Sequence, residues 1–176
     1  MHLFNLLERK VKEEMAVSFR TVAIVTIILL STLTAATSPS GKELHTRTRA
    51  EANIIVESSE AKPYDQTLSP ALIEIHLNEK FTGDIVGDSP VRALQVLRDD
   101  KSASLVSVQR FHGRLGGREG TFVLQGSEIV ENGKIKATWT VVSGSGTGDL
   151  SGLRGEGGFE GEFGKGSRGW LDYWFE

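Results

Sequence analysis

The chain has 176 residues, of which 39% are hydrophobic and 24% are charged, and its formal net charge is −3. This composition is that of an ordinary globular protein and excludes a largely disordered chain. The slight acidic excess gives no electrostatic basis for binding nucleic acid, so we predict no nucleic-acid partner. The sequence contains no cysteine, which excludes disulfides, a thiol nucleophile and a thiolate metal site.

Residues 1–36 are predicted to form a signal-peptide helix. Arg20 precedes the uncharged apolar run "TVAIVTIILLSTL" (21–33), and small residues follow it, with a predicted cleavage point after Ala36. This leader predicts a secreted or periplasmic protein. The alternative is a membrane anchor over residues 21–38, but its second half is Ser, Thr and Ala rather than the usual apolar stretch. Met15 is an alternative translation start, which would leave residues 1–14 outside the protein.

After a polar linker at residues 37–49, residues 50–176 are predicted to form a single domain of eight β-strands. The clearest strand is "ALIEIHLNEKF" (71–81), in which Ile73, Ile75 and Leu77 fall on one face and polar residues on the other. Such alternation gives one buried and one solvated face, as in antiparallel sheets. The other expected strands lie at residues 53–58, 91–98, 104–112, 120–130, 134–142, 157–163 and 169–176.

The segments between these strands are short and have turn chemistry. Asn132-Gly133 is a strong two-residue hairpin signal, because both central positions of that turn need positive φ. Asp99-Asp100 and Gly116-Gly117 indicate two further turns. Short connections without helices favour antiparallel neighbours. We therefore predict an all-β fold, a single antiparallel eight-stranded barrel, with a two-sheet sandwich as the alternative.

The stretch "VVSGSGTGDLSGLRGEGGFEGEFG" (141–164) is rich in glycine but matches no phosphate-binding motif. A dinucleotide fingerprint would need a third glycine at Asp149 or Ser151, and Lys165 is followed by glycine rather than by the Ser or Thr of a Walker loop. We predict a long turn over residues 143–154 followed by a strand that its glycines bend. No cofactor is expected.

Four blocks of the chain resemble, in order, a mostly bacterial family known as domain of unknown function 3224: "KFTGDIVGDS", "GRLGGREGTFVLQ", "ATWTVVSGSGTGDLSGLRGEGGF" and "LDYWFE". The similarity runs from about residue 50 to residue 176. It implies an antiparallel barrel of the allene oxide cyclase-like type with no assigned biochemical function. The chain departs from the family's usual pattern at Gly126, where relatives have His, and at Gln109, where relatives often have Glu. A proton transfer by those side chains could not occur in the same way here.

The sequence contains no recognisable catalytic or metal-binding constellation. The histidines lack metal-ligand spacing, and no serine lies in a G-x-S-x-G elbow. The catalytic residues, if any, stay unassigned, and no metal site is predicted. Aromatic residues instead concentrate in the last four strands, which predicts either a filled core or an apolar cavity. The candidates for lining such a cavity are the inward-facing Phe122, Leu124, Trp139 and Tyr173, with Gln109 and Gln125 as polar groups that orient a ligand.

Three functions fit these observations. The favoured hypothesis is a non-enzymatic barrel that binds a small apolar ligand. The second is a cyclase or isomerase acting on an apolar substrate, which rests on analogy of fold and requires an inward-facing carboxylate or other polar group beside a cavity. The third is a structural or assembly barrel. The sequence does not indicate the oligomeric state, and a membrane partner is expected only through an uncleaved leader.

Overall fold

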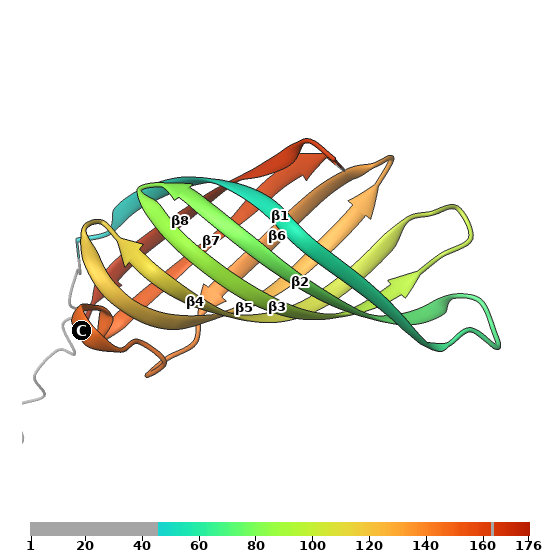
Figure 1. The fold of residues 1–176 in the computed structure, drawn as a ribbon, viewed down its shortest axis with the longest axis horizontal. Coiled ribbons are helices and arrows are strands. Elements are labelled where there is room, and N and C mark those ends of the chain that lie inside the picture. The colour runs from blue at the N-terminus through green and yellow to red at the C-terminus, as the bar shows by residue number, and fades with distance from the viewer. Residues whose placement is uncertain (1–45, 163) are drawn as a thin grey trace, which may run out of the picture. The chain divides into compact units, whose positions relative to one another are not determined.

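The computed structural model describes residues 46–162 and 164–176, so the predicted signal peptide and most of the predicted linker lie outside the described residues. Eight strands form a closed barrel in which each strand is antiparallel to its neighbours, and β1 pairs with β8 to complete the ring (Figure 1). The strands are β1 (Thr48–Asp65), β2 (Ala71–Gly83), β3 (Ile85–Leu97), β4 (Ala103–Leu115), β5 (Arg118–Glu131), β6 (Lys134–Val141), β7 (Leu153–Glu162) and β8 (Gly166–Phe175).

This architecture confirms the prediction of an all-β, eight-stranded, antiparallel barrel and excludes the two-sheet sandwich. Each predicted strand is present, and most extend beyond the stretch whose alternation predicted them. Alternation gives each strand one face that points into the barrel. Closure of the sheet then pairs the strands with neighbours on both sides, which removes free sheet edges where that pairing is complete. In the part of the chain that the structure describes, no helix is long and apolar enough to cross a membrane.

The β5–β6 connection is the two-residue hairpin that the sequence indicated. Glu131 pairs with Lys134, and the two intervening residues, Asn132 and Gly133, have φ angles of 51° and 73°. Asn and Gly tolerate this left-handed region better than other residues, and the resulting turn matches the twist of the strands that it joins. The local sequence therefore sets the register of β5 against β6.

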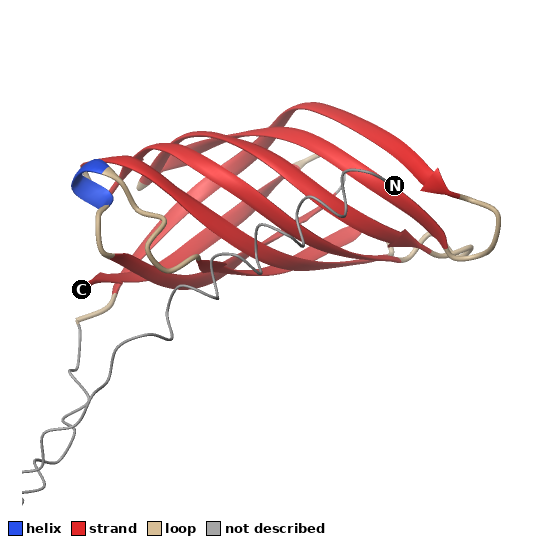
Figure 2. Ribbon diagram, turned by 90° about the horizontal axis from the view of Figure 1, so that it is seen from below, coloured by secondary structure: helices blue, strands red, loops and turns tan. Residues whose placement is uncertain are grey.

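The two ends of the barrel differ. At one end, here called the closed end, lie the β2–β3 and β4–β5 connections and the long β6–β7 connection, which contains the short 3₁₀ turn Gly148–Leu150 (Figure 2). At the other end, here called the open end, lie the turns of the β1–β2, β3–β4, β5–β6 and β7–β8 hairpins (Figure 1). The glycine-rich segment thus forms a connection and a strand, and the only helical element between Gly146 and Leu153 is that single short turn.

The β6–β7 connection covers the closed end. Thr147 is bound to the edge of β5 by a backbone hydrogen bond from its N–H to the carbonyl oxygen of Thr121, at 2.9 Å. The hydroxyl of Thr147 accepts a second hydrogen bond from the N–H of Thr121, at 3.1 Å. This anchoring places Leu150 and Leu153 inside the barrel, where both are fully buried. The connection is therefore a packed lid on this end.

The hydrophobic core fills the half of the barrel next to the closed end. Phe111 contacts Phe81 and Phe122, with ring centroids 5.6 Å and 4.8 Å away. Trp139 lies across β7 and donates a hydrogen bond from its indole nitrogen to the carbonyl oxygen of Trp170, at 3.1 Å. The core cluster consists of Ala50, Ala52, Ile54, Phe81, Ile85, Phe111, Leu115, Phe122, Leu124, Trp139, Val141, Leu150, Leu153 and Leu171.

Candidate functional site

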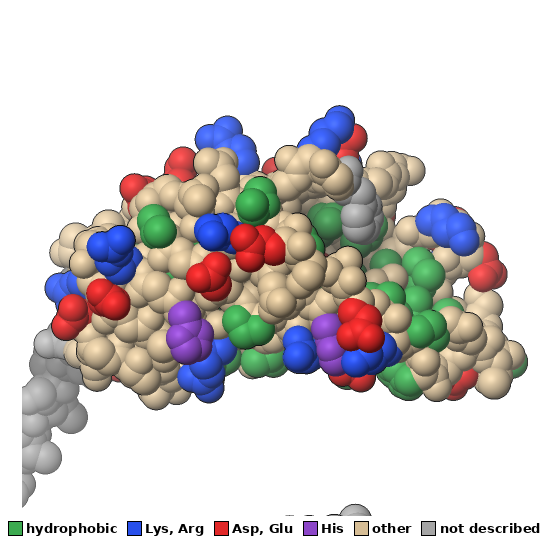
Figure 3. Space-filling model, viewed as in Figure 1, with side chains coloured by type: hydrophobic (Ala, Val, Ile, Leu, Met, Phe, Trp, Pro, Cys, Tyr) green, Lys and Arg blue, Asp and Glu red, His purple; other side chains and the backbone are tan. Residues whose placement is uncertain are grey.

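The half of the barrel next to the open end contains a cavity of about 730 Å³. From outside, hydrophobic side chains gather at this end, where the surface is hollowed (Figure 3). The cavity walls come from all eight strands and include the aliphatic side chains of Ile75, Leu77, Val91, Leu105, Val130 and Ile135. Its volume falls within the range of roughly 300–1,000 Å³ that is usual for small-molecule sites.

The alternation of β2 explains how the packed core gives way to the cavity. Ile75, Leu77, Glu79 and Phe81 share the inward face of this strand, as expected when successive side chains point to opposite faces. Phe81 belongs to the core, whereas Ile75 and Leu77 are half-buried because they face the cavity. Glu79 lies between them, at the boundary of the two regions.

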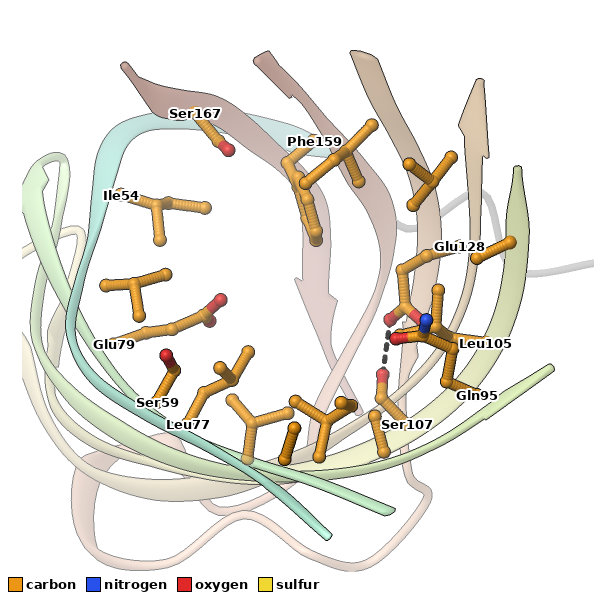
Figure 4. Close-up of a pocket in the computed structure, with 18 of the residues that line it drawn as sticks. Ile54, Ser59, Leu77, Glu79, Gln95, Leu105, Ser107, Glu128, Phe159 and Ser167 are labelled. Carbon is orange, nitrogen blue, oxygen red and sulfur yellow. Dashed lines mark hydrogen bonds between the residues drawn. The ribbon is translucent and has the colours of Figure 1, made fainter. Parts of the chain in front are cut away.

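A set of buried polar side chains, here called the polar layer, lies at this boundary. Its members are Glu79, Ser89, Ser107, Gln109 and Glu128, all of which are at most 9% exposed. The hydroxyl of Ser89 donates a hydrogen bond to Oε1 of Gln109 at 3.0 Å. The hydroxyl of Ser107 donates one to Oε1 of Glu128 at 2.5 Å. Glu79 points into the cavity from one side and Glu128 from the other, where the hydrogen bond to Ser107 is drawn (Figure 4).

The carboxyl group of Glu128 is incompletely satisfied. Its Oε2 atom is buried and has no hydrogen-bond partner among the described residues. Gly126, two residues earlier on the same face of β5, leaves room for this carboxyl group, because a Cβ there would lie 3.0 Å from Oε1 of Glu128 and 2.8 Å from Oγ of Ser107. Buried polar atoms without partners are uncommon in folded proteins and often mark a place where a ligand or ion completes the structure.

Burial favours the protonated form of both carboxyl groups. It raises the pKa of Glu79 to about 7, and the negative charge of Glu128 adds to this shift. Burial also raises the pKa of Glu128, although the hydrogen bond from Ser107 acts in the opposite direction. Shifts of this kind are produced when a carboxylate is removed from water without a cation to compensate it. Glu79 can therefore gain or lose a proton near neutral pH.

The remaining charged side chains of the cavity lie nearer the open end. They are Glu60 on β1, Lys101 in the β3–β4 turn, Glu162 at the end of β7 and Lys165 in the β7–β8 turn. Lys165 donates a hydrogen bond to Glu162 at 3.0 Å. The described lining contains no arginine and no histidine. No group of three or more acidic, histidine or cysteine side chains that could hold a metal ion occurs in residues 46–162 and 164–176.

The residues that the sequence proposed for a ligand pocket lie in three different places. Gln109 lines the cavity as a member of the polar layer. Phe122, Leu124 and Trp139 are buried in the core cluster, and Tyr173 packs against that cluster near the closed end. Gln125 is exposed on the outer face of β5. The structure therefore does not bring these six residues together around the cavity.

The sequence reasoning did not single out Glu79 and Glu128, although the pattern contained a signal for both. The alternation that places Ile73, Ile75 and Leu77 on the inward face of β2 reaches Glu79 one step later. The same rule carries Leu124 to Glu128 on β5. A charged residue in register with a buried apolar face is the observation that would have found them.

Comparisons with known proteins agree with the fold and with the sequence blocks. Residues 50–175 match the family described as "Protein of unknown function (DUF3224)". A solved structure of a DUF3224-family protein of unknown function from Shewanella oneidensis MR-1 is similar, with a TM-score of 0.61 and 25% sequence identity. That alignment covers 74% of this chain and 98% of the other. No curated protein matches the chain significantly.

Proposed function

The chain belongs to the DUF3224 family, and from that premise and from its cavity we propose that the barrel binds one small, largely apolar molecule. The observation that supports this function is the unfilled half of the barrel, a space of about 730 Å³ with aliphatic walls and a buried polar layer at its inner end. Binding sites for small molecules commonly combine an apolar wall with a few polar groups that fix orientation. Because one half is fully packed, the barrel can hold its shape while the other half stays available.

Dye binding tests this proposal. The full chain would be titrated with N-phenyl-1-naphthylamine, a neutral apolar dye that becomes fluorescent in apolar surroundings. Ala93 lines the cavity and is 4% exposed, so Ala93→Phe would fill part of the space. The neighbouring Leu94 is 50% exposed on the outer face, which makes Leu94→Phe the matched control. We expect dye binding in the unmodified chain and in the control, and a loss in Ala93→Phe. Equal binding by all three would contradict the proposal.

We also propose that the protein is exported from the cytoplasm. The leader predicted at residues 1–36 supports a ligand encountered outside the cytoplasm. Expression in a bacterial host followed by amino-terminal sequencing of the exported protein tests it. A mature chain starting at Thr37 is the expected result, whereas a protein that stays in the cytoplasm with its leader intact would contradict export.

A second candidate function is proton transfer within an apolar substrate, as in an isomerase. It is favoured by Glu79, whose pKa of about 7 suits both acceptance and donation of a proton at neutral pH. In such a reaction a carboxylate would remove a proton next to a carbonyl group and return it at another carbon. The substrate is then rearranged without gain or loss of atoms, and no co-reactant is needed.

The isomerase candidate can be tested with cyclohex-3-enone, whose conversion to the conjugated cyclohex-2-enone is followed by absorbance. Enzymatic catalysis would give a rate that depends on a group with a pKa near 7 and that Glu79→Gln abolishes. Glu160→Gln is the control, because Glu160 lies in an exposed ion pair with Lys136 on the outer face. Catalysis that survives Glu79→Gln would exclude Glu79 as the base.

A further inference from the structure

We propose that the ligand carries a cationic amine on its apolar body, and that the amine binds in the polar layer with Glu79 and Glu128 as its acceptors. This inference rests on the proposed binding function and specifies the chemical class of the ligand. It follows from the hydrogen-bonding needs of the two carboxyl groups, from the charges around them, and from the aliphatic walls above them.

The two carboxyl groups offer acceptors that the described protein leaves unused. Oε2 of Glu128 has no partner, and no described residue hydrogen-bonds to the carboxyl group of Glu79, which is 7% exposed. A protonated primary amine has three N–H donors and no acceptor, so it can satisfy several such oxygens at once. A hydroxyl group supplies one donor, and a carboxylate supplies none.

The charges that face the polar layer also favour a cation. The charged side chains of the polar layer itself are Glu79 and Glu128, both acidic. Glu60, Lys101, Glu162 and Lys165 border the cavity nearer the open end, where Glu60 forms an ion pair with Lys62 at 3.1 Å. Among the described residues, no ion pair joins Glu79 or Glu128 to a basic side chain, whereas Lys165 is already bonded to Glu162. A buried carboxylate is stabilised mainly by an opposite charge close to it. An anionic ligand would instead add a third negative group to this region.

The walls above the polar layer define the rest of the ligand. Between the polar layer and the open end the cavity surface is formed by Ile75, Leu77, Val91, Leu105, Val130 and Ile135. Aliphatic walls favour an aliphatic or alicyclic body, because burying apolar surface is favourable by about 25 cal/mol per Å². The ligand class is therefore an amphipathic amine whose charged end enters first.

Binding of such an amine should be linked to proton release. In the empty cavity, burial and the nearby charge of Glu128 keep the carboxyl group of Glu79 partly protonated at neutral pH, and burial also raises the pKa of Glu128. An ammonium group stabilises their ionised forms, so protons leave as it binds. Affinity should then rise as the pH increases from about 5.5 to about 8, a range in which an alkylamine stays protonated because its pKa is close to that of lysine, about 10.4.

Three probes with the same chain length test the proposal: octylamine, octanol and octanoate, each used to displace N-phenyl-1-naphthylamine from the full chain at pH 5.5, 7 and 8. We expect octylamine to bind at least about tenfold more tightly than octanol at pH 8, and octanoate to bind most weakly. Octylamine binding should strengthen with pH, and octanol binding should not. Calorimetry at pH 7 in buffers of different ionisation enthalpy should show proton release with octylamine alone.

Substitutions locate the amine. Glu79→Gln and Glu128→Gln keep the shape of the side chain and remove the charge, so each should weaken octylamine binding by about tenfold or more while octanol binding is retained. Retained octanol binding also shows that each variant is folded. The exposed Glu160→Gln should change neither affinity.

The possible failures are distinguishable. If octanol binds as tightly as octylamine, or if octanoate binds more tightly, the amine inference is overturned and the barrel remains a binding protein for apolar molecules. The same conclusion follows if neither glutamine variant weakens octylamine binding. If the dye and all three probes fail to bind the unmodified chain, the proposed function itself is overturned.

Discussion

Glu79 and Glu128 place two buried carboxyl groups where none of the described residues forms an ion pair with them. Glu79 is 7% exposed and Glu128 9% exposed, and the hydrogen bond from Ser107 satisfies only one of the two oxygens of Glu128. Proteins usually avoid this arrangement, because removing an ionised carboxylate from water costs several kcal/mol unless it is paired. The protonated forms reduce that cost. These two residues should consequently make the barrel less stable as the pH rises, whereas most acidic residues make a folded protein more stable as they ionise.

Comparison of Glu79→Gln with the unmodified chain tests this dependence. Because the folded-state pKa of Glu79 is raised to about 7 from its ordinary 4.5, the folded protein retains a proton that the unfolded chain has released between these values. The stabilising effect of Glu79 is complete below pH 4.5 and is lost as the pH rises through 7. Relative to the variant, the unmodified chain should lose up to about 3 kcal/mol of unfolding free energy across this window.

Urea unfolding at pH 4, 5.5, 7 and 8.5, without ligand, provides the measurement. The difference between the two proteins should change mainly between pH 4.5 and 7 and then level off. Parallel stability profiles across the whole range would show that Glu79 titrates normally and would remove the basis for its role as a proton donor or acceptor.

At the scale of elements, strands β6, β7 and β8 approach one another closely enough that one position in β7 has no room for a side chain. The indole ring of Trp139 crosses Gly157 to reach the carbonyl oxygen of Trp170. A Cβ on Gly157 would lie 2.0 Å from that oxygen and 2.6 Å from the indole nitrogen. The glycine therefore permits the contact that holds these three strands around the core.

Replacement of Gly157 by alanine should lower the free energy of unfolding by about 3 kcal/mol, because the added methyl group displaces Trp139 or separates the strands. Gly117→Ala is the control. Gly117 lies in the β4–β5 turn with a φ of +83°, and a Cβ added there would have no other atom within 4 Å, so this change should cost only the conformational strain of about 1 kcal/mol. Chemical denaturation followed by tryptophan fluorescence measures both, and equal losses would argue against the close approach.

The β6–β7 connection is a second element whose contribution can be isolated. Leu150 is fully buried beneath it at the closed end, so Leu150→Ala should leave a void and reduce the unfolding free energy by about 3 kcal/mol. Leu68, which is 80% exposed in the β1–β2 turn, gives the control Leu68→Ala, with an expected change of less than about 0.5 kcal/mol. Dye binding should persist in both variants because Leu150 is not part of the cavity lining. Loss of dye binding in a folded Leu150→Ala protein would contradict the separation of the two halves.

At the scale of the whole molecule, the barrel is divided into a packed half and a hollow half. The pairing of β1 shows the division clearly. Its residues from Thr48 to Ile54 pair with β8, and pairing with β2 begins at Ala52. The β8 pairing ends at Ile54 and Ser167, and from there to Asp65 β1 pairs only with β2. Residues 57–65 are exposed on both faces. The wall of the barrel thus has fewer strand pairings around the cavity than around the core.

Amide hydrogen exchange should report this difference. Residues 57–65 of β1 should exchange faster than residues 103–115 of β4, which pairs with a neighbour on each side over most of its length. Peptide-resolved mass spectrometry of the full chain gives the measurement. Equal protection of these two segments would show that the free part of β1 is held as firmly as the closed wall.

The fold was largely predictable because its determinants are local. Alternation assigned a strand to each segment, and pairs such as Asn132-Gly133 assigned the turns, so the ring of antiparallel neighbours followed. The site was less predictable. Alternation gives the face of the strand on which Phe122 or Trp139 lies. The position of each residue along the barrel axis depends instead on the stagger between strands. Pairings between residues distant in sequence, such as Ile54 with Phe81, establish that stagger. The sequence placed Gln109 correctly beside a cavity. It would also have identified Glu79 if the alternation of β2 had been followed one step past Leu77.

The positions of the strand ends have a practical consequence. Thr48 at the start of β1 pairs with Tyr173 near the end of β8, so both lie at the closed end. A tether attached after Phe175 would therefore leave the four open-end hairpin turns facing away from a solid support. The sequences of those turns could then be randomised to make recognition loops around the cavity. The packed half of the immobilised barrel would contain none of the randomised positions.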